Sequence, residues 1–409
     1  IIIDNFEVKQ YPKEKYIILD YFIIDLVNKK VELYDKNEKD SFIDGFKNID
    51  KINIINHKET GNKQIEIIVP NRDKIIIIVD KENRIVEYKN NNIISIGNNF
   101  LYYNRMLKNI ELENLLYVGN NFLYYNRMME SLELPKLIKV NKHFLARNKK
   151  LKYLKLPLLM SVDSCFLVDN SDLKELELSN LIHAGDEFLY HNKCIQKFEA
   201  PNLLEIGDDF FLNNSELSHL FLPRVNTIGN NFLYWNSSLS NLDLPELKRI
   251  GDDCLTNNKS VIFLNLPQVT EIGNNFLQAN RTLTHIKFPK LVKVGYNFLQ
   301  YNNSLVDLEM PKLISVSHFF LAHNTTLKNF YAPRLTKVGG FFLEKNKNLS
   351  EKILNENYFE IPKLFALDVP YDEEIKSTKQ PNLFIKKQIK KIIYLYKIRY
   401  IVLDSIKKY

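Results

Sequence analysis

Apolar and polar positions recur with a fixed period of 22 residues from Gly97 onward. With Gly97 as position 0, Phe stands at position 3 and Leu at position 4, each in eleven of twelve repeats. An L-x-L segment follows, as at Leu242 and Leu244, and further aliphatic residues close the unit. The unit is G-x-x-F-L-x-x-N-x-x-L-x-x-L-x-L-P-x-L-x-x-I, without insertion or deletion across twelve copies. This regularity is typical of a solenoid, whose stacked coils cannot change length independently.

The pattern within one repeat predicts a strand, a turn and a short helical piece. The L-x-L segment alternates as a strand does and stops at Pro, which cannot donate a ladder hydrogen bond. The F-L-x-x-N segment spaces apolar and amide groups at helical distances. Position 0 is Gly in nine of twelve repeats and Asn or Asp in two more, which predicts a left-handed backbone there.

The two ends of the chain depart from this period. Residues 1–90 contain short apolar stretches separated by polar turns, and a degenerate repeat begins near Ile75. We expect a β-rich domain over 1–90 that caps a solenoid over 91–360. Residues 361–381 contain three prolines and predict a linker, while 382–409 predict a basic amphipathic helix.

The segment IGNNFLQANRTLTHIKFP, from Ile272 to Pro289, carries the central part of the unit. It resembles the BspA-like class of leucine-rich repeats, whose pattern is I-G-x-x-A-F-x-x-C-x-x-L-x-x-I-x-L-P. Phe-Leu replaces Ala-Phe here, and Asn replaces Cys. The resemblance implies a binding surface and supplies no catalytic residue. With the predicted ends, the expected fold is an α/β solenoid: a curved leucine-rich-repeat stack with a parallel sheet on the concave face, a β-rich N-terminal cap and a helical C-terminus.

Position 7 is Asn in all twelve repeats. A buried Asn can donate two hydrogen bonds and accept two, so we interpret the column as a structural ladder between successive turns. Glycosylation and metal binding are the alternatives, and five members stand in N-x-S/T motifs. The column comprises Asn104, Asn126, Asn148, Asn170, Asn192, Asn214, Asn236, Asn258, Asn280, Asn302, Asn324 and Asn346.

Paired acids occupy positions 1 and 2 of two repeats, at Asp208-Asp209 and Asp252-Asp253. Calcium binding is one interpretation, and capping of free N–H groups before the helical piece is the simpler one. Three unevenly spaced cysteines match neither a disulfide framework nor a zinc site. We expect no metal, no cofactor and no catalytic residue.

The positions that vary between repeats are the candidates for function. Outward side chains of the L-x-L strand fall at positions 12 and 14, and in the middle repeats several are aromatic, as in an interface. The alternative is an ordinary solvated strand face. We predict a protein-binding surface centred on His219, Phe221, Asp243, Phe263, Asn265, His285 and Lys287.

A second variable pair follows Phe-Leu, on the predicted helical side. These side chains either pack between neighbouring coils or form an exposed aromatic strip. Its aromatic members include Tyr102, Tyr103, Tyr124, Tyr125, Tyr234 and Trp235.

Charge concentrates at the C-terminal end. Residues 382–409 hold eight basic residues and one acid, a charge of +7 that equals the formal net charge of the whole chain. We therefore expect no nucleic-acid partner. The segment 382–409 is a candidate for binding an anionic membrane or an acidic partner, or for capping the last coil. No apolar stretch is long enough to span a membrane, so we expect a soluble chain of unknown compartment. A signal peptide is absent from this sequence, and its earlier removal is compatible with it.

Three functions remain after this reading. The leading hypothesis is a non-enzymatic leucine-rich-repeat scaffold that binds a partner protein of unknown identity through its concave face. The second is an assembly or membrane-associated structural protein that uses the solenoid and the basic C-terminal helix, with self-association. The last is a repeat-targeted enzyme with activity in the N-terminal domain.

Overall fold

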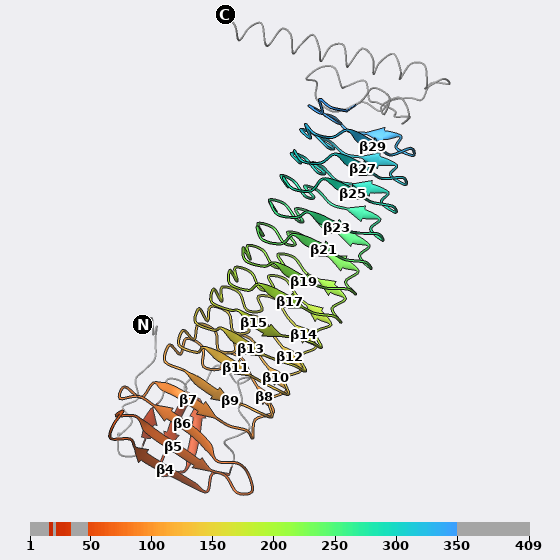
Figure 1. Cartoon of the computed structure of the whole chain (residues 1–409). Helices are drawn as coiled ribbons and strands as arrows, with labels where there is room; N and C mark the ends of the chain where they lie inside the picture. The colour runs from red at the N-terminus through yellow and green to blue at the C-terminus, as the bar shows by residue number, and fades with distance from the viewer. Residues whose placement is uncertain (1–15, 19–21, 34–47, 350–409) are drawn as a thin grey trace, which may run out of the picture. The chain divides into compact units, whose positions relative to one another are not determined.

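The computed structural model describes residues 16–18, 22–33 and 48–349. The chain divides into two compact units, Ile1–Ile195 and Gln196–Tyr409, which are described one at a time. All regular elements of the described residues are strands, and none is a helix (Figure 1). The predicted linker over 361–381 and the predicted helix over 382–409 lie outside the described residues.

The first unit begins with antiparallel sheets. One contains β1 (Tyr16–Ile18), β2 (Phe22–Asp25) and β3 (Lys30–Leu33) in that order. The other is a meander of β4 (Lys51–Asn56), β5 (Lys63–Ile68), β6 (Ile75–Val79) and β7 (Ile85–Lys89). Strand β7 then pairs in parallel with β9 (Asn109–Glu111), with Tyr88 opposite Ile110, 22 residues later. The β-rich N-terminal segment and the repeats therefore share one ladder, and β7 belongs to the degenerate repeat.

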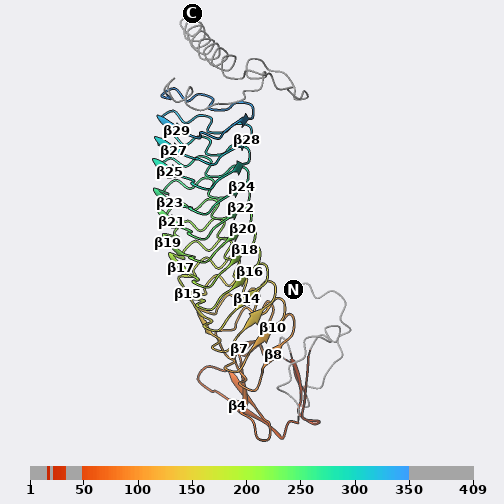
Figure 2. The ribbon, with the colours of Figure 1, turned by 90° about the vertical axis from the view of Figure 1, so that its right-hand side faces the viewer.

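Each coil contributes two short strands, and Figure 2 shows the two kinds on opposite sides of the coils. In the first unit the later L-x-L strands are β11 (Ser131–Glu133), β13 (Tyr153–Lys155) and β15 (Glu175–Glu177). The closing strands are β8 (Ser95–Ile96), β10 (Tyr117–Val118), β12 (Lys139–Val140), β14 (Ser161–Val162) and β16 (His183–Ala184). Partners are parallel and 22 residues apart, as with Leu132 and Leu154. The predicted L-x-L strand is confirmed, and the closing strands form a second ladder that the pattern did not predict.

The second unit repeats this arrangement. Its L-x-L strands are β17 (Lys197–Glu199), β19 (His219–Phe221), β21 (Asn241–Asp243), β23 (Phe263–Asn265), β25 (His285–Lys287), β27 (Asp307–Glu309) and β29 (Asn329–Tyr331). Its closing strands are β18 (Glu205–Ile206), β20 (Thr227–Ile228), β22 (Arg249–Ile250), β24 (Glu271–Ile272), β26 (Lys293–Val294), β28 (Ser315–Val316) and β30 (Lys337–Val338). The closing strands pair in parallel from β18 through β30, each with the equivalent strand of the next coil.

The F-L-x-x-N segment is not helical, so the prediction of an α/β class is wrong for the described residues. Positions 2, 4 and 6 have positive φ in all twelve coils, as at Asn121 (57°), Leu123 (51°) and Tyr125 (64°). Position 4 is the least expected of the three, because a left-handed conformation costs a Leu about 1–2 kcal/mol. With no helical pieces in the described coils, the predicted cause of curvature is also absent there.

Hydrogen bonds between coils explain this backbone. The Asn121 N–H donates to the Lys142 carbonyl of the next coil (2.9 Å), and the Leu123 N–H donates to the Phe100 carbonyl of the previous coil (3.0 Å). In a helix these N–H groups would bond within the segment. Here the alternating conformation aims them at neighbouring coils while burying the adjacent side chains of Phe122 and Leu123. A flat strand would place those two side chains on opposite faces.

The glycine column has a different cause from the one predicted. Among the described glycines only Gly61 has positive φ, so position 0 is not left-handed. A Cβ on Gly251 would instead lie 2.6 Å from the carbonyl carbon of Gly229 in the previous coil. Gly119 donates its N–H to the preceding coil over 2.8 Å, whereas Asp163, which has a Cβ, does so over 3.3 Å. Glycine is therefore favoured at position 0 because successive backbones approach closely there.

The core of each unit is a row of phenylalanine rings from position 3. In the first unit the rings of Phe100, Phe122, Phe144 and Phe166 stack in succession at centroid distances of 5.4–5.7 Å. All four side chains are fully buried. Burial of apolar area is the main favourable free-energy term of such a stack, and each ring depends on its neighbouring coils for it.

We predict that Gly251→Ala lowers the free energy of unfolding by about 1–3 kcal/mol, because the new methyl group meets backbone atoms that cannot rotate away. Gly340→Ala is the matched control, since its Cβ would meet only the His318 side chain. We expect that change to cost less than about 1 kcal/mol. Denaturant unfolding followed by circular dichroism measures both, and equal losses would contradict the close-approach explanation.

Candidate functional site

The seven residues of the predicted protein-binding surface lie on four L-x-L strands of the second unit. They occupy the outward positions of β19, β21, β23 and β25, on either side of inward residues such as Leu220 and Leu264, which are buried. The two phenylalanines are the exposed apolar members. Phe221 is 47% exposed and Phe263 is 53% exposed, and β21 lies between their strands in the chain. The neighbouring Ile262, which the predicted surface omitted, is 60% exposed and extends the apolar area around Phe263.

The histidines of this face have carboxylate partners on the same face. His219 Nε2 lies 3.2 Å from Glu199 Oε1, and His285 Nε2 lies 2.7 Å from Asp307 Oδ2. Hydrogen bonds from Lys197 and His219 hold the pKa of Glu199 below its ordinary value. That carboxylate is therefore charged at neutral pH.

The remaining polar members are also paired between coils. Asn265 Nδ2 donates to Asp243 Oδ1 over 2.9 Å, across the β21–β23 pair. Lys287 Nζ lies 2.8 Å from Glu309 Oε2, and this contact raises the pKa of Lys287. The polar groups of the face thus bind one another, and the two phenyl rings are left facing solvent.

The aromatic strip gathers into two separate clusters, one in each unit. In the first unit the rings of Tyr102 and Tyr124 stack at 5.1 Å, and those of Tyr103 and Tyr125 lie 4.6 Å apart. In the second unit the Tyr234 and Trp235 rings lie 6.2 Å apart.

Sequence reasoning missed the arginines beside the first cluster. Arg105 and Arg127 stand at position 8, directly after the Asn column, and both reach over the Tyr125 ring. The signal was the Y-Y-N-R string itself, because position 8 lies beside position 6 once the chain turns at Asn.

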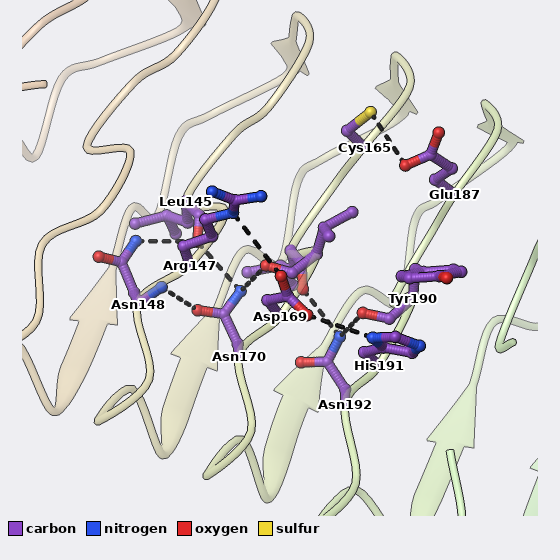
Figure 3. Close-up of polar contacts among 12 residues, drawn as sticks. Leu145, Arg147, Asn148, Cys165, Asp169, Asn170, Glu187, Tyr190, His191 and Asn192 are labelled. Atoms are coloured by element: carbon purple, nitrogen blue, oxygen red, sulfur yellow. Dashed lines mark hydrogen bonds and ion pairs between the residues drawn. The ribbon is translucent and has the colours of Figure 1, made fainter. Parts of the chain in front are cut away.

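The asparagine column is buried inside the coils, apart from the half-buried Asn346. Figure 3 shows Asn148, Asn170 and Asn192 in successive coils. Asn170 Nδ2 donates to the carbonyl of Leu145 in the previous coil over 3.0 Å, and Asn192 repeats this contact with Leu167 over 2.8 Å. The acceptor is each time the carbonyl of the left-handed Leu at position 4.

The same contact recurs in the second unit, with one exception. Asn236 donates to Phe211 over 2.7 Å and Asn258 donates to Leu233 over 2.6 Å. Asn280 instead donates to the Asn258 carbonyl and accepts from the Leu283 N–H within its own coil. Amides buried in this way offer no exposed nitrogen to a glycan.

The acid pairs do not cap helices, because no helix follows them in the described residues. Asp208 Oδ1 accepts the Asn230 N–H of the next coil over 2.7 Å, and Asp252 Oδ1 accepts that of Asn274 over 2.7 Å. Asp253 Oδ1 accepts from the Asn275 side chain over 2.9 Å. Positions 1 and 2 therefore form two further side-chain ladders between coils. No cluster of three or more His, Cys, Asp or Glu that could hold a metal occurs in the described part of the chain.

We predict that Asn236→Ala lowers the free energy of unfolding by about 1–3 kcal/mol, because the carbonyls of Phe211 and Tyr234 lose their buried donor. Asn303→Ala is the control, since Asn303 is exposed, and its cost should stay within about 0.5 kcal/mol. Thermal and denaturant unfolding measure both variants. An Asn236→Ala protein as stable as the control would contradict the ladder.

The only tryptophan of the chain tests the aromatic strip. Trp235 is 56% exposed, so its emission should lie close to that of the denatured chain and be quenched readily by acrylamide. A blue-shifted emission that resists quenching would show a ring packed between coils instead.

Comparison with known proteins was made on the whole chain. The family described as "BspA type Leucine rich repeat region (6 copies)" matches residues 85–192, 184–306 and 248–368. No curated protein matches the chain. No helix of the described residues is long and apolar enough to cross a membrane.

Three solved structures are similar at low sequence identity. A leucine-rich cell surface protein of Faecalibacterium prausnitzii is 13% identical, with 71% of this chain and 94% of that one covered and a TM-score of 0.36. A leucine-rich repeat protein of Bacteroides ovatus is 15% identical, with 76% and 98% covered and a TM-score of 0.40. The pneumococcal vaccine antigen PcpA is 12% identical, with 76% and 99% covered and a TM-score of 0.40. The family assignment rests on the matched repeats, which span more than half of the sequence, together with the 22-residue parallel ladders: this chain belongs to the BspA-type leucine-rich repeat family.

Proposed function

We propose that the chain is a non-enzymatic scaffold that binds a partner protein through the L-x-L strand face of its second unit. The observation that carries this proposal is the exposure of Phe221 and Phe263 on a face whose polar side chains are already paired. Large apolar side chains held on regular strands are the groups that gain most from burial by a partner. Their positions are fixed by parallel ladders, so little conformational entropy is lost on binding.

The paired polar groups have a different role in this proposal. His219, His285 and Lys287 each form an ion pair or hydrogen bond with a carboxylate of the adjacent coil. Exposed pairs of this kind contribute little to stability. At an interface they orient the partner and disfavour partners of the wrong charge. The phenyl rings would therefore supply most of the affinity, and the charged pairs the selectivity.

The environment of the cysteines supports a role without covalent catalysis. Burial raises the pKa of the Cys165 thiol to about 12, with the nearby Glu187 carboxylate adding to the effect. Burial also raises the pKa of Cys254. A thiol of this kind stays protonated at neutral pH and is a poor nucleophile.

Phe221→Ala combined with Phe263→Ala should abolish capture of the partner from native extract, while the melting temperature stays close to that of the unaltered chain. The matched control is Tyr296→Ala with Phe341→Ala, two similarly exposed aromatic side chains in the turn segments. Equal capture by both double variants would overturn the proposal. The captured protein is identified by mass spectrometry and its binding is remeasured with purified components.

A further inference from the structure

The tyrosine cluster of the first unit shows mainly ring edges and hydroxyls to solvent. The Tyr102 and Tyr124 rings are nearly parallel, at 18°, and the Tyr103 ring lies 4.5 Å from Tyr102 and 4.6 Å from Tyr125. Each ring therefore has at least one neighbour against its face. Even so, Tyr102 is 43% exposed and Tyr103 is 41% exposed.

Three exposed arginines surround these rings. The guanidinium carbon of Arg127 lies 4.1 Å from the Tyr125 ring centre, and that of Arg105 lies 5.6 Å from it. Arg147 lies 5.8 Å from the centre of the Tyr124 ring. Such cation–π contacts hold the guanidinium groups in place and leave their N–H edges free to bind an anion.

The charge of this surface is mostly uncompensated. Arg147 has a carboxylate partner, Asp169, at 3.6 Å. Among the described residues no carboxylate lies within ion-pair distance of Arg105 or Arg127. Lys149 and Lys150 of the following coil are also exposed. An anionic partner therefore matches this surface in charge.

The tyrosine hydroxyls remain donors at neutral pH. Burial raises the pKa of Tyr102, and the neighbouring Tyr103 adds to the rise. Burial also raises the pKa of Tyr124. A protonated phenol can donate one hydrogen bond and accept others, which suits a ligand rich in hydroxyl groups.

We propose that this surface, formed by Tyr102, Tyr103, Tyr124, Tyr125, Arg105, Arg127 and Arg147, binds an acidic polysaccharide with carboxylates on successive sugar rings. Guanidinium groups would bind the carboxylates, and the phenols would bind the sugar hydroxyls. Coils repeat about every 4.8 Å, a length comparable to one sugar ring. An acidic peptide offers the carboxylates without the hydroxyls. A single-stranded nucleic acid requires open ring faces for its bases, and here neighbouring rings and guanidinium groups cover them.

Binding of polygalacturonate to the full chain tests this proposal, measured by calorimetry with neutral dextran as the comparison. We expect polygalacturonate to bind and dextran not to bind. Arg105→Gln with Arg127→Gln should weaken binding by at least about tenfold, because charge-assisted hydrogen bonds are lost. Tyr102→Phe with Tyr124→Phe keeps the stacked rings and removes two hydroxyls, so it should weaken binding while preserving the fold.

The control is Arg224→Gln with Arg334→Gln, which makes the same charge change at two exposed arginines of the second unit. It should bind polygalacturonate as the unaltered chain does. Absence of binding, or equal loss in both arginine pairs, would overturn the proposal. Tighter binding of polyglutamate or of oligo(dT) than of polygalacturonate would overturn the assignment of the ligand class. The result is independent of Phe221 and Phe263, so it separates this surface from the protein-binding face.

Discussion

Hydrogen bonding between successive coils is the constraint on which the rest of this structure depends. Backbone N–H groups of the turn segments bond to the coil before or the coil after, as at Leu123 and Asn121. The close approach of backbones at Gly251, the left-handed Leu at position 4 and the buried Asn at position 7 all serve this bonding. A coil of any other length would break every one of these contacts at once, which explains the invariant period of 22.

The same constraint leaves only the outward positions free to carry function. In the second unit those positions expose Phe221 and Phe263 among polar side chains that pair with one another. In the first unit they gather tyrosines and arginines from adjacent coils into one cationic surface. The two surfaces differ in chemistry although their coils have the same internal design. A repeat protein can therefore acquire new surfaces by changing a few side chains in successive coils.

Sequence reasoning succeeded where a residue's role depends on its own coil and failed where the role depends on the next one. The L-x-L strand was predicted because alternation is a local signal, and Leu242 is buried as expected. The helical turn was wrong because spacing alone cannot tell whether an N–H group bonds within its segment or to a neighbouring coil. The left-handed glycine was wrong for the same reason, since Gly251 faces the backbone of Gly229. Arg127 was overlooked because its partner ring was expected on a helix.

The sequence by itself determined the repeat length, the parallel stacking of identical coils, the buried columns and the outward positions available for binding. These follow from periodicity, because identical spacing permits identical packing. Only the tertiary structure decided the conformation of the turn segment, the second ladder and the partners of each exposed side chain. Those depend on atoms that are 22 residues away in sequence and in van der Waals contact in space, as Asn98 is with Gly119. No local pattern records such a distance.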